Sequence, residues 1–125
     1  MPAFDGAVEF TLKSADLKDA LRKTHYAISL DETRYVLNGI FFSFKGDKLT
    51  LVATDGRRLA LAEVIDLEIP SSQEREFIVR TKAIHELMRA LRDDGDVTIR
   101  LAQNMVQFDC GPTTLISKLV EGNYP

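Results

Sequence analysis

The sequence predicts an α+β domain built from two copies of a β-α-β-β-β unit, with two helices on one face of antiparallel sheet. Two segments carry this prediction, FTLKSADLKDALRK from Phe10 and FIVRTKAIHELMRA from Phe77. In each, a short alternating strand ends in a basic residue, a Ser or Thr follows, and an amphipathic helix begins. Each helix is followed by three more alternating segments separated by turn residues, which completes the repeat.

Composition places the chain among compact single domains. It has 125 residues, of which 45% are apolar, so it is long enough to bury a core. No basic region followed by an apolar run opens the sequence, and no stretch approaches the roughly 20 apolar residues that span a bilayer. We therefore expect a cytoplasmic protein. Cys110 is the only cysteine, which excludes an internal disulfide and a thiolate-rich metal site.

The first unit is expected to begin with a strand over residues 8–12 and to continue with a helix over residues 15–26. Ser14 is the expected helix N-cap, because its hydroxyl can accept a hydrogen bond from an otherwise unpaired amide. The apolar stripe of this helix falls at i, i+3, i+4 and i+7, the spacing of one helical face. Its members are Leu17, Ala20, Leu21 and Thr24.

Three strands should complete this unit. Residues 35–44 are rich in aromatic and β-branched side chains, with a bulge expected at Gly39. Residues 48–64 alternate on both sides of Asp55-Gly56, a pair that suits a two-residue type I′ turn. These residues therefore predict a β-hairpin.

The second unit repeats the first from residue 76. A strand over residues 76–80 is followed by Thr81 as the expected N-cap and by a helix that ends near residue 93. The apolar stripe of this helix consists of Ile84, Leu87, Met88 and Leu91. The three remaining strands are expected over residues 97–101, 105–109 and 114–120.

The sequence offers little that could support catalysis. His25 and His85 lie on the two helices with no other ligand at metal-binding spacing, and no glycine-rich phosphate loop or nucleophile elbow is present. Asp55 has a sufficient structural role as a turn residue. We therefore expect neither an enzyme nor a bound cofactor or metal. Arg57 and Arg58 follow the turn and place two guanidinium groups at one end of the sheet, although solvated arginines are the alternative interpretation.

Charge is unevenly distributed. The net charge is −3, yet residues 13–23 carry four basic and two acidic side chains and residues 81–92 carry three and one, so the rest of the chain carries −7. If the helices lie side by side, they present a basic face that could contact a phosphate backbone without reading bases. Ordinary solvated helix charges are the alternative. The face would consist of Lys18, Arg22, Lys23, Lys82, Arg89 and Arg92.

Three motifs together resemble the middle domain of the bacterial β sliding clamp, the processivity subunit of DNA polymerase III. They are TRYVLNGIFFSF at 33–44, ATDGRRLA at 53–60 and SKLVEGNYP at 117–125. The resemblance implies the DNA clamp fold, in which a non-catalytic subunit of three similar domains forms a head-to-tail dimeric ring around duplex DNA during replication. Residues 1–125 would then be one domain of a longer subunit, and this domain alone is expected to be a monomer.

The resemblance also implies a pocket that receives short linear motifs from polymerase, clamp-loader and repair proteins. A free-standing peptide-binding interaction module is the alternative function. Arg57 stands where the family often has His, and Val36 stands where some members have a second aromatic residue, so Tyr35 and Arg34 are the expected additional DNA contacts. By resemblance, this chain contributes to the pocket Leu37, Thr54, Gly56, Arg57, Arg58, Leu59 and Pro125.

Overall fold

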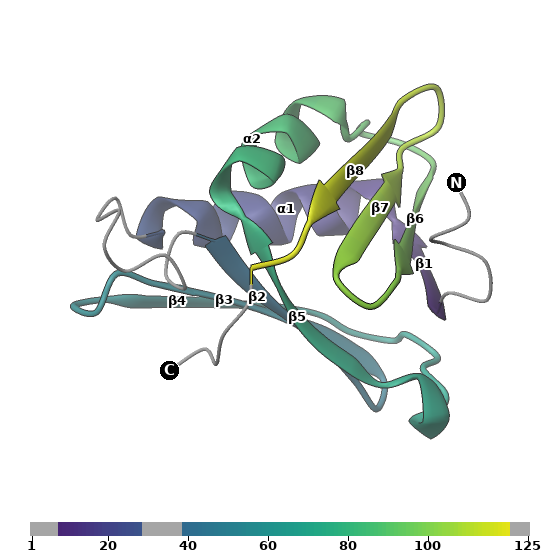
Figure 1. Ribbon diagram of the computed structural model, residues 1–125, viewed down its shortest axis with the longest axis horizontal. Helices are drawn as coiled ribbons and strands as arrows, with labels where there is room; N and C mark the ends of the chain where they lie inside the picture. The colour runs from purple at the N-terminus through teal and green to yellow at the C-terminus, as the bar shows by residue number, and fades with distance from the viewer. Residues whose placement is uncertain (1–7, 29–38, 121–125) are drawn as a thin grey trace.

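The computed structural model describes residues 8–28 and 39–120, and its elements follow the predicted order (Figure 1). Two β-α-β-β-β units follow one another, so this part of the sequence-based prediction is confirmed. The first unit contains β1 (Val8–Lys13), α1 (Ser14–Thr24), the 3-10 turn η2 (His25–Ala27), β2 (Gly39–Lys45), β3 (Lys48–Thr54) and β4 (Leu59–Val64). The second contains the 3-10 turn η4 (Ser71–Gln73), β5 (Arg75–Arg80), α2 (Thr81–Ala90), β6 (Asp96–Leu101), β7 (Met105–Asp109) and β8 (Thr114–Lys118).

The strands of the described residues form two antiparallel sheets of four, and the units exchange their first strands. One sheet has the order β1-β6-β7-β8 and the other has the order β4-β3-β2-β5. Strand β1 therefore pairs with the second unit, with Phe10 opposite Ile99, while β5 pairs with the first unit, with Phe77 opposite Phe42. Because each sheet needs a strand from the other unit, the two repeats form one interlocked domain.

The helices and the inner faces of both sheets enclose one core. Helix α1 packs on β3 and β4, and α2 packs on β2, β5 and β8 (Figure 1). The rings of Phe10 and Phe44, one from each sheet, stack with centroids 3.8 Å apart. This stack joins the two sheets directly. Both predicted stripes face the core, with Met88 only partly buried and the other seven members buried, namely Leu17, Ala20, Leu21, Thr24, Ile84, Leu87 and Leu91.

Neither predicted N-cap is a cap. Ser14 is the first residue of α1, and its hydroxyl donates to the carbonyl oxygen of Arg92 at 2.9 Å and accepts from the Arg92 amide at 3.1 Å. Thr81 is likewise the first residue of α2, and within residues 8–28 and 39–120 its Oγ1 has no hydrogen-bond partner. The strands run directly into the helices, so the cap positions are occupied by Lys13 and Arg80. Ser14 instead ties the start of α1 to the segment that follows α2.

The predicted bulge at Gly39 is also wrong. Gly39 is the first residue of β2 and pairs with Arg80 at the end of an unbroken register between β2 and β5. A Cβ atom at this position would overlap the carbonyl oxygen of Val79. The glycine therefore permits a close approach between two strands.

Candidate functional site

The turn between β3 and β4 differs from the predicted type I′ turn. Thr54 pairs with Leu59, which leaves four residues, 55–58, in the connection. Gly56 has a φ of 92°, whereas Asp55 is not among the residues of positive φ in the described part of the chain. The longer turn forms because an Asp side chain can accept hydrogen bonds from amides that follow it in the sequence.

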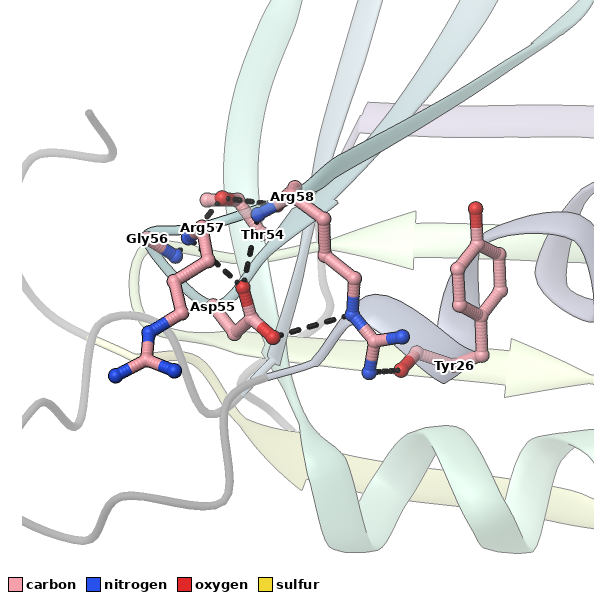
Figure 2. A network of polar contacts seen from close by, with 6 residues as sticks. All are labelled: Tyr26, Thr54, Asp55, Gly56, Arg57 and Arg58. Atoms are coloured by element: carbon pink, nitrogen blue, oxygen red, sulfur yellow. Dashed lines mark hydrogen bonds and ion pairs between the residues drawn. The ribbon is translucent and has the colours of Figure 1, made fainter.

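Side chains of the turn itself fix its conformation (Figure 2). The Oδ1 atom of Asp55 accepts from the backbone amides of Arg57 and Arg58 at 2.9 and 3.0 Å. The Thr54 hydroxyl donates to the Arg58 carbonyl at 2.6 Å and accepts from the Gly56 amide at 3.1 Å. The two amides that bind Asp55, with a smaller contribution from the Arg58 guanidinium, lower the pKa of the Asp55 carboxyl.

The Arg58 side chain is held between Asp55 of its own turn and Tyr26 of η2. Its Nε donates to Oδ2 of Asp55 at 3.1 Å, and one Nη donates to the carbonyl oxygen of Tyr26 at 2.9 Å. The guanidinium carbon also lies 5.3 Å from the centroid of the Tyr26 ring, within the range of a cation–π contact. In Figure 2 the Arg57 side chain extends away from Arg58. Both arginines are exposed, but the turn holds only the Arg58 guanidinium group in place.

An exposed apolar residue follows the turn. Strand β4 buries Ala60, Ala62 and Val64, while Leu59 and Leu61 face outward and are 61% and 55% exposed. This phase is unusual, because the larger side chains lie on the solvent side of the strand. A large apolar surface therefore lies directly beside the polar turn.

The turn brings together five of the seven predicted pocket residues and adds two that sequence reasoning missed. The five are Thr54, Gly56, Arg57, Arg58 and Leu59, while Leu37 and Pro125 lie outside the described residues. The missed residues are Asp55 and Tyr26. An Asp three residues before an Arg was a usable signal for Asp55, but nothing local indicated Tyr26, which lies 32 residues from Arg58.

The predicted basic face is partly neutralised by nearby carboxylates. Arg92 lies just beyond α2, and its guanidinium pairs with Asp94. Arg34 and Tyr35, the other predicted DNA contacts, lie outside the described residues. The N···O distances are 2.9 Å for Lys18–Asp93, 2.9 Å for Lys23–Asp19 and 3.4 Å for Arg92–Asp94. Arg22, Lys82 and Arg89 are exposed and form no ion pair within the described residues.

Other kinds of site find no support in the described residues. Residues 8–28 and 39–120 contain no group of three or more His, Cys, Asp or Glu side chains that could hold a metal ion. No helix in the same ranges has the length and apolar character needed to cross a membrane. Cys110 is buried, and this burial raises the pKa of its thiol.

Solved structures with the same architecture define the class of protein. The chain superposes on the DNA polymerase sliding clamp from Bacillus subtilis with a TM-score of 0.90 and 31% identity, covering 100% of this chain and 33% of that one. It superposes on the sliding clamp from Pseudomonas aeruginosa bound to griselimycin with a TM-score of 0.87 and 38% identity, covering 94% of this chain and 32% of that one. The fold is therefore that of a sliding-clamp domain.

The family is defined by a sequence match over almost the whole chain. Residues 11–125 match the family described as DNA polymerase III beta subunit, central domain. The chain belongs to this family, which confirms the resemblance found in the sequence. The Beta sliding clamp of Chlamydia muridarum is 37% identical over 125 residues, which are 100% of this chain and 34% of that protein. The chain thus spans about one third of the length of the curated relatives it matches.

Proposed function

We propose that residues 1–125 are the middle domain of a non-catalytic replication processivity factor, a subunit of three similar domains that encircles duplex DNA. The observation that carries this proposal is the match of the whole chain to one third of the Beta sliding clamp of Chlamydia muridarum. Such a subunit works in the bacterial cytoplasm as a homodimeric ring. Residues 1–125 alone should be a monomer, and light scattering is the measurement that checks this; a stable dimer at micromolar concentration would contradict it. A free-standing interaction module is not favoured, because the matched regions lie within sliding clamps.

The second part of the proposal concerns the turn between β3 and β4. It forms one wall of a pocket for linear motifs of polymerase, clamp-loader and repair proteins. Arg58 is 58% exposed and offers N–H donors, while Leu59 offers apolar surface for a Leu or Phe anchor. By resemblance to the family, Leu37 and Pro125 are the remaining proposed members of this wall. Because a Pseudomonas aeruginosa relative was solved bound to griselimycin, we propose that this compound binds here as well.

The third part concerns DNA. The exposed guanidinium and ammonium groups of Arg22, Lys82 and Arg89 are available for phosphate contact, while three nearby cations are shared with carboxylates. Phosphate contacts of this kind are independent of base sequence and weaken as salt rises. They suit a ring that holds DNA topologically and slides along it. Lys18, Lys23, Arg92, Arg34 and Tyr35 are the remaining proposed members of this surface.

The test uses a synthetic pentapeptide, Gln-Leu-Ala-Leu-Phe, titrated into isotopically labelled protein. Chemical-shift changes are expected at Gly56, Arg58 and Leu59. Because this chain supplies only part of the pocket, saturation is expected only at high peptide concentration: losing about 100 Å² of apolar contact costs on the order of 2.5 kcal/mol, or nearly a hundredfold in affinity. Arg58→Ala should abolish the changes, and Arg89→Ala should leave them intact. Shifts confined to α1 and α2 would show that the pocket lies elsewhere.

A further inference from the structure

We infer that Asp55 and Tyr26 are positioning residues, which hold the Arg58 guanidinium in one orientation so that its remaining N–H groups bind an oxygen acceptor of a partner peptide. This inference rests on the proposed peptide site at the β3–β4 turn. It adds to that site two residues that need not touch the peptide themselves.

The geometry around Arg58 is unusual for an exposed arginine. Its side chain is 58% exposed, yet it makes contacts in three directions. The Nε atom meets Asp55 Oδ2 at 3.1 Å, an Nη atom meets the carbonyl oxygen of Tyr26 at 2.9 Å, and the ring of Tyr26 lies 5.3 Å from the guanidinium carbon. Two hydrogen bonds from different nitrogen atoms, together with the position of the guanidinium carbon over the Tyr26 ring, restrain the orientation of the group.

The contacts leave donors for a ligand. A guanidinium group carries five N–H donors in a fixed fork. Asp55 and the Tyr26 carbonyl accept one each, so three N–H groups on the two Nη atoms have no acceptor among the described residues. Arg57 extends away from this group and does not compete for the same acceptor (Figure 2). Leu59, which follows Arg58 in the sequence, is 61% exposed and offers apolar surface next along the chain.

Restraint of Arg58 before binding should increase affinity. A free arginine loses rotamer freedom when a ligand immobilises it, and each such side chain weakens binding by about twofold to twelvefold. In this structure the contacts with Asp55 and Tyr26 have already removed part of that freedom. The two residues therefore act on affinity through Arg58.

Two substitutions remove one restraint each with little other change. Tyr26→Ala removes the ring but keeps the backbone carbonyl that binds Arg58, and Tyr26 is 54% exposed, so the core is not disturbed. Asp55→Asn keeps an Oδ1 acceptor for the amides of Arg57 and Arg58 but replaces the Oδ2 acceptor of Nε with a donor. Each variant should bind the pentapeptide about twofold to twelvefold more weakly than the parent. Tyr26→Phe, the matched control, should bind within about twofold of the parent.

A spectroscopic readout follows the restraint itself. The ring current of Tyr26 should shift the δ-methylene protons of Arg58 upfield in the parent and in Tyr26→Phe, and the shift should disappear in Tyr26→Ala. The Arg58 Nε–H signal should exchange slowly in the parent and rapidly in Asp55→Asn, because its acceptor is lost. A general loss of structure would instead broaden or move the amide signals of the whole sheet.

The proposed site and the positioning role fail in different ways. If Arg58→Ala binds the peptide as well as the parent, the proposed site is wrong. If Arg58→Ala abolishes binding while Tyr26→Ala and Asp55→Asn keep the parent affinity, the site stands and the positioning role is overturned. On an Arg58→Lys background, Tyr26→Ala should have no further effect, since a lysine keeps the charge but lacks the planar fork. A further loss there would show that Tyr26 binds the peptide directly, which also overturns the inference.

Discussion

Ser14 should stabilise this domain through Arg92 and not through its own helix. The side chain is 2% exposed and lies at the first position of α1. Its hydroxyl both donates to and accepts from the backbone of Arg92, 78 residues away. Ser14→Ala removes this hydroxyl and leaves the backbone carbonyl and the backbone amide of Arg92 without this partner.

The size of the effect follows from the two hydrogen bonds. Each bond contributes about 0.5–1.5 kcal/mol, so Ser14→Ala should lower the free energy of unfolding by about 1–3 kcal/mol. Ser14→Asp separates the two possible roles. Asp is as good an N-cap as Ser and gains about 0.3–1 kcal/mol from the helix dipole. At this buried site, however, its carboxylate cannot donate to the Arg92 carbonyl, and burial of an unpaired charge costs about 3–5 kcal/mol.

Urea unfolding followed by circular dichroism measures these differences. The urea midpoint should be highest for the parent, lower for Ser14→Ala and lowest for Ser14→Asp. Ala15→Asp is the matched control, because Ala15 is exposed in the same helical turn and an acidic side chain there gains from the dipole without burial. The reasoning is refuted if the urea midpoint of Ser14→Asp equals or exceeds that of Ser14→Ala. That result would be expected if residue 14 acted as a helix N-cap.

Three further results are expected. Gly39→Ala should lower the free energy of unfolding by about 1–3 kcal/mol, because its Cβ would overlap the Val79 carbonyl oxygen, and a urea midpoint equal to that of the parent would contradict this close approach. The pKa of the Asp55 carboxyl, followed by carbon NMR, should lie below the usual value of about 3.9. The contribution of this carboxyl to stability is therefore complete above about pH 3.9 and disappears as the pH falls through the lower folded-state pKa. A titration midpoint above about 3.9 would disprove the role of the Arg57 and Arg58 amides. The domain alone should bind duplex DNA barely at physiological salt, and any binding at low salt should ignore base sequence and weaken in Arg89→Ala; fluorescence anisotropy that reveals salt-tolerant, base-specific binding would rule out a purely electrostatic contact.

The candidate site shows where sequence reasoning stopped. The motif ATDGRRLA is sufficient to locate the turn, and its resemblance to the family implies that Thr54, Arg58 and Leu59 are pocket residues. The predicted type I′ turn is wrong because that prediction considers only the backbone conformations that Asp and Gly favour. In the structure, the Asp55 side chain accepts two backbone hydrogen bonds and stabilises a longer turn. The contact between Arg58 and Tyr26 was missed, since a guanidinium can reach many neighbours and the sequence does not say which one folding brings close.

Local sequence patterns are sufficient to predict the order of the elements and the buried face of each helix. Periodicity is a local property, so alternating strands and a stripe such as Leu17 and Leu21 can be read from neighbouring residues alone. Three features become visible only in the folded chain: β1 and β5 exchange sheets, Phe10 stacks on Phe44, and Ser14 binds the backbone after α2. Each of these depends on contacts between residues far apart in the chain. Local patterns leave such pairings open, and the burial of one shared core selects among them.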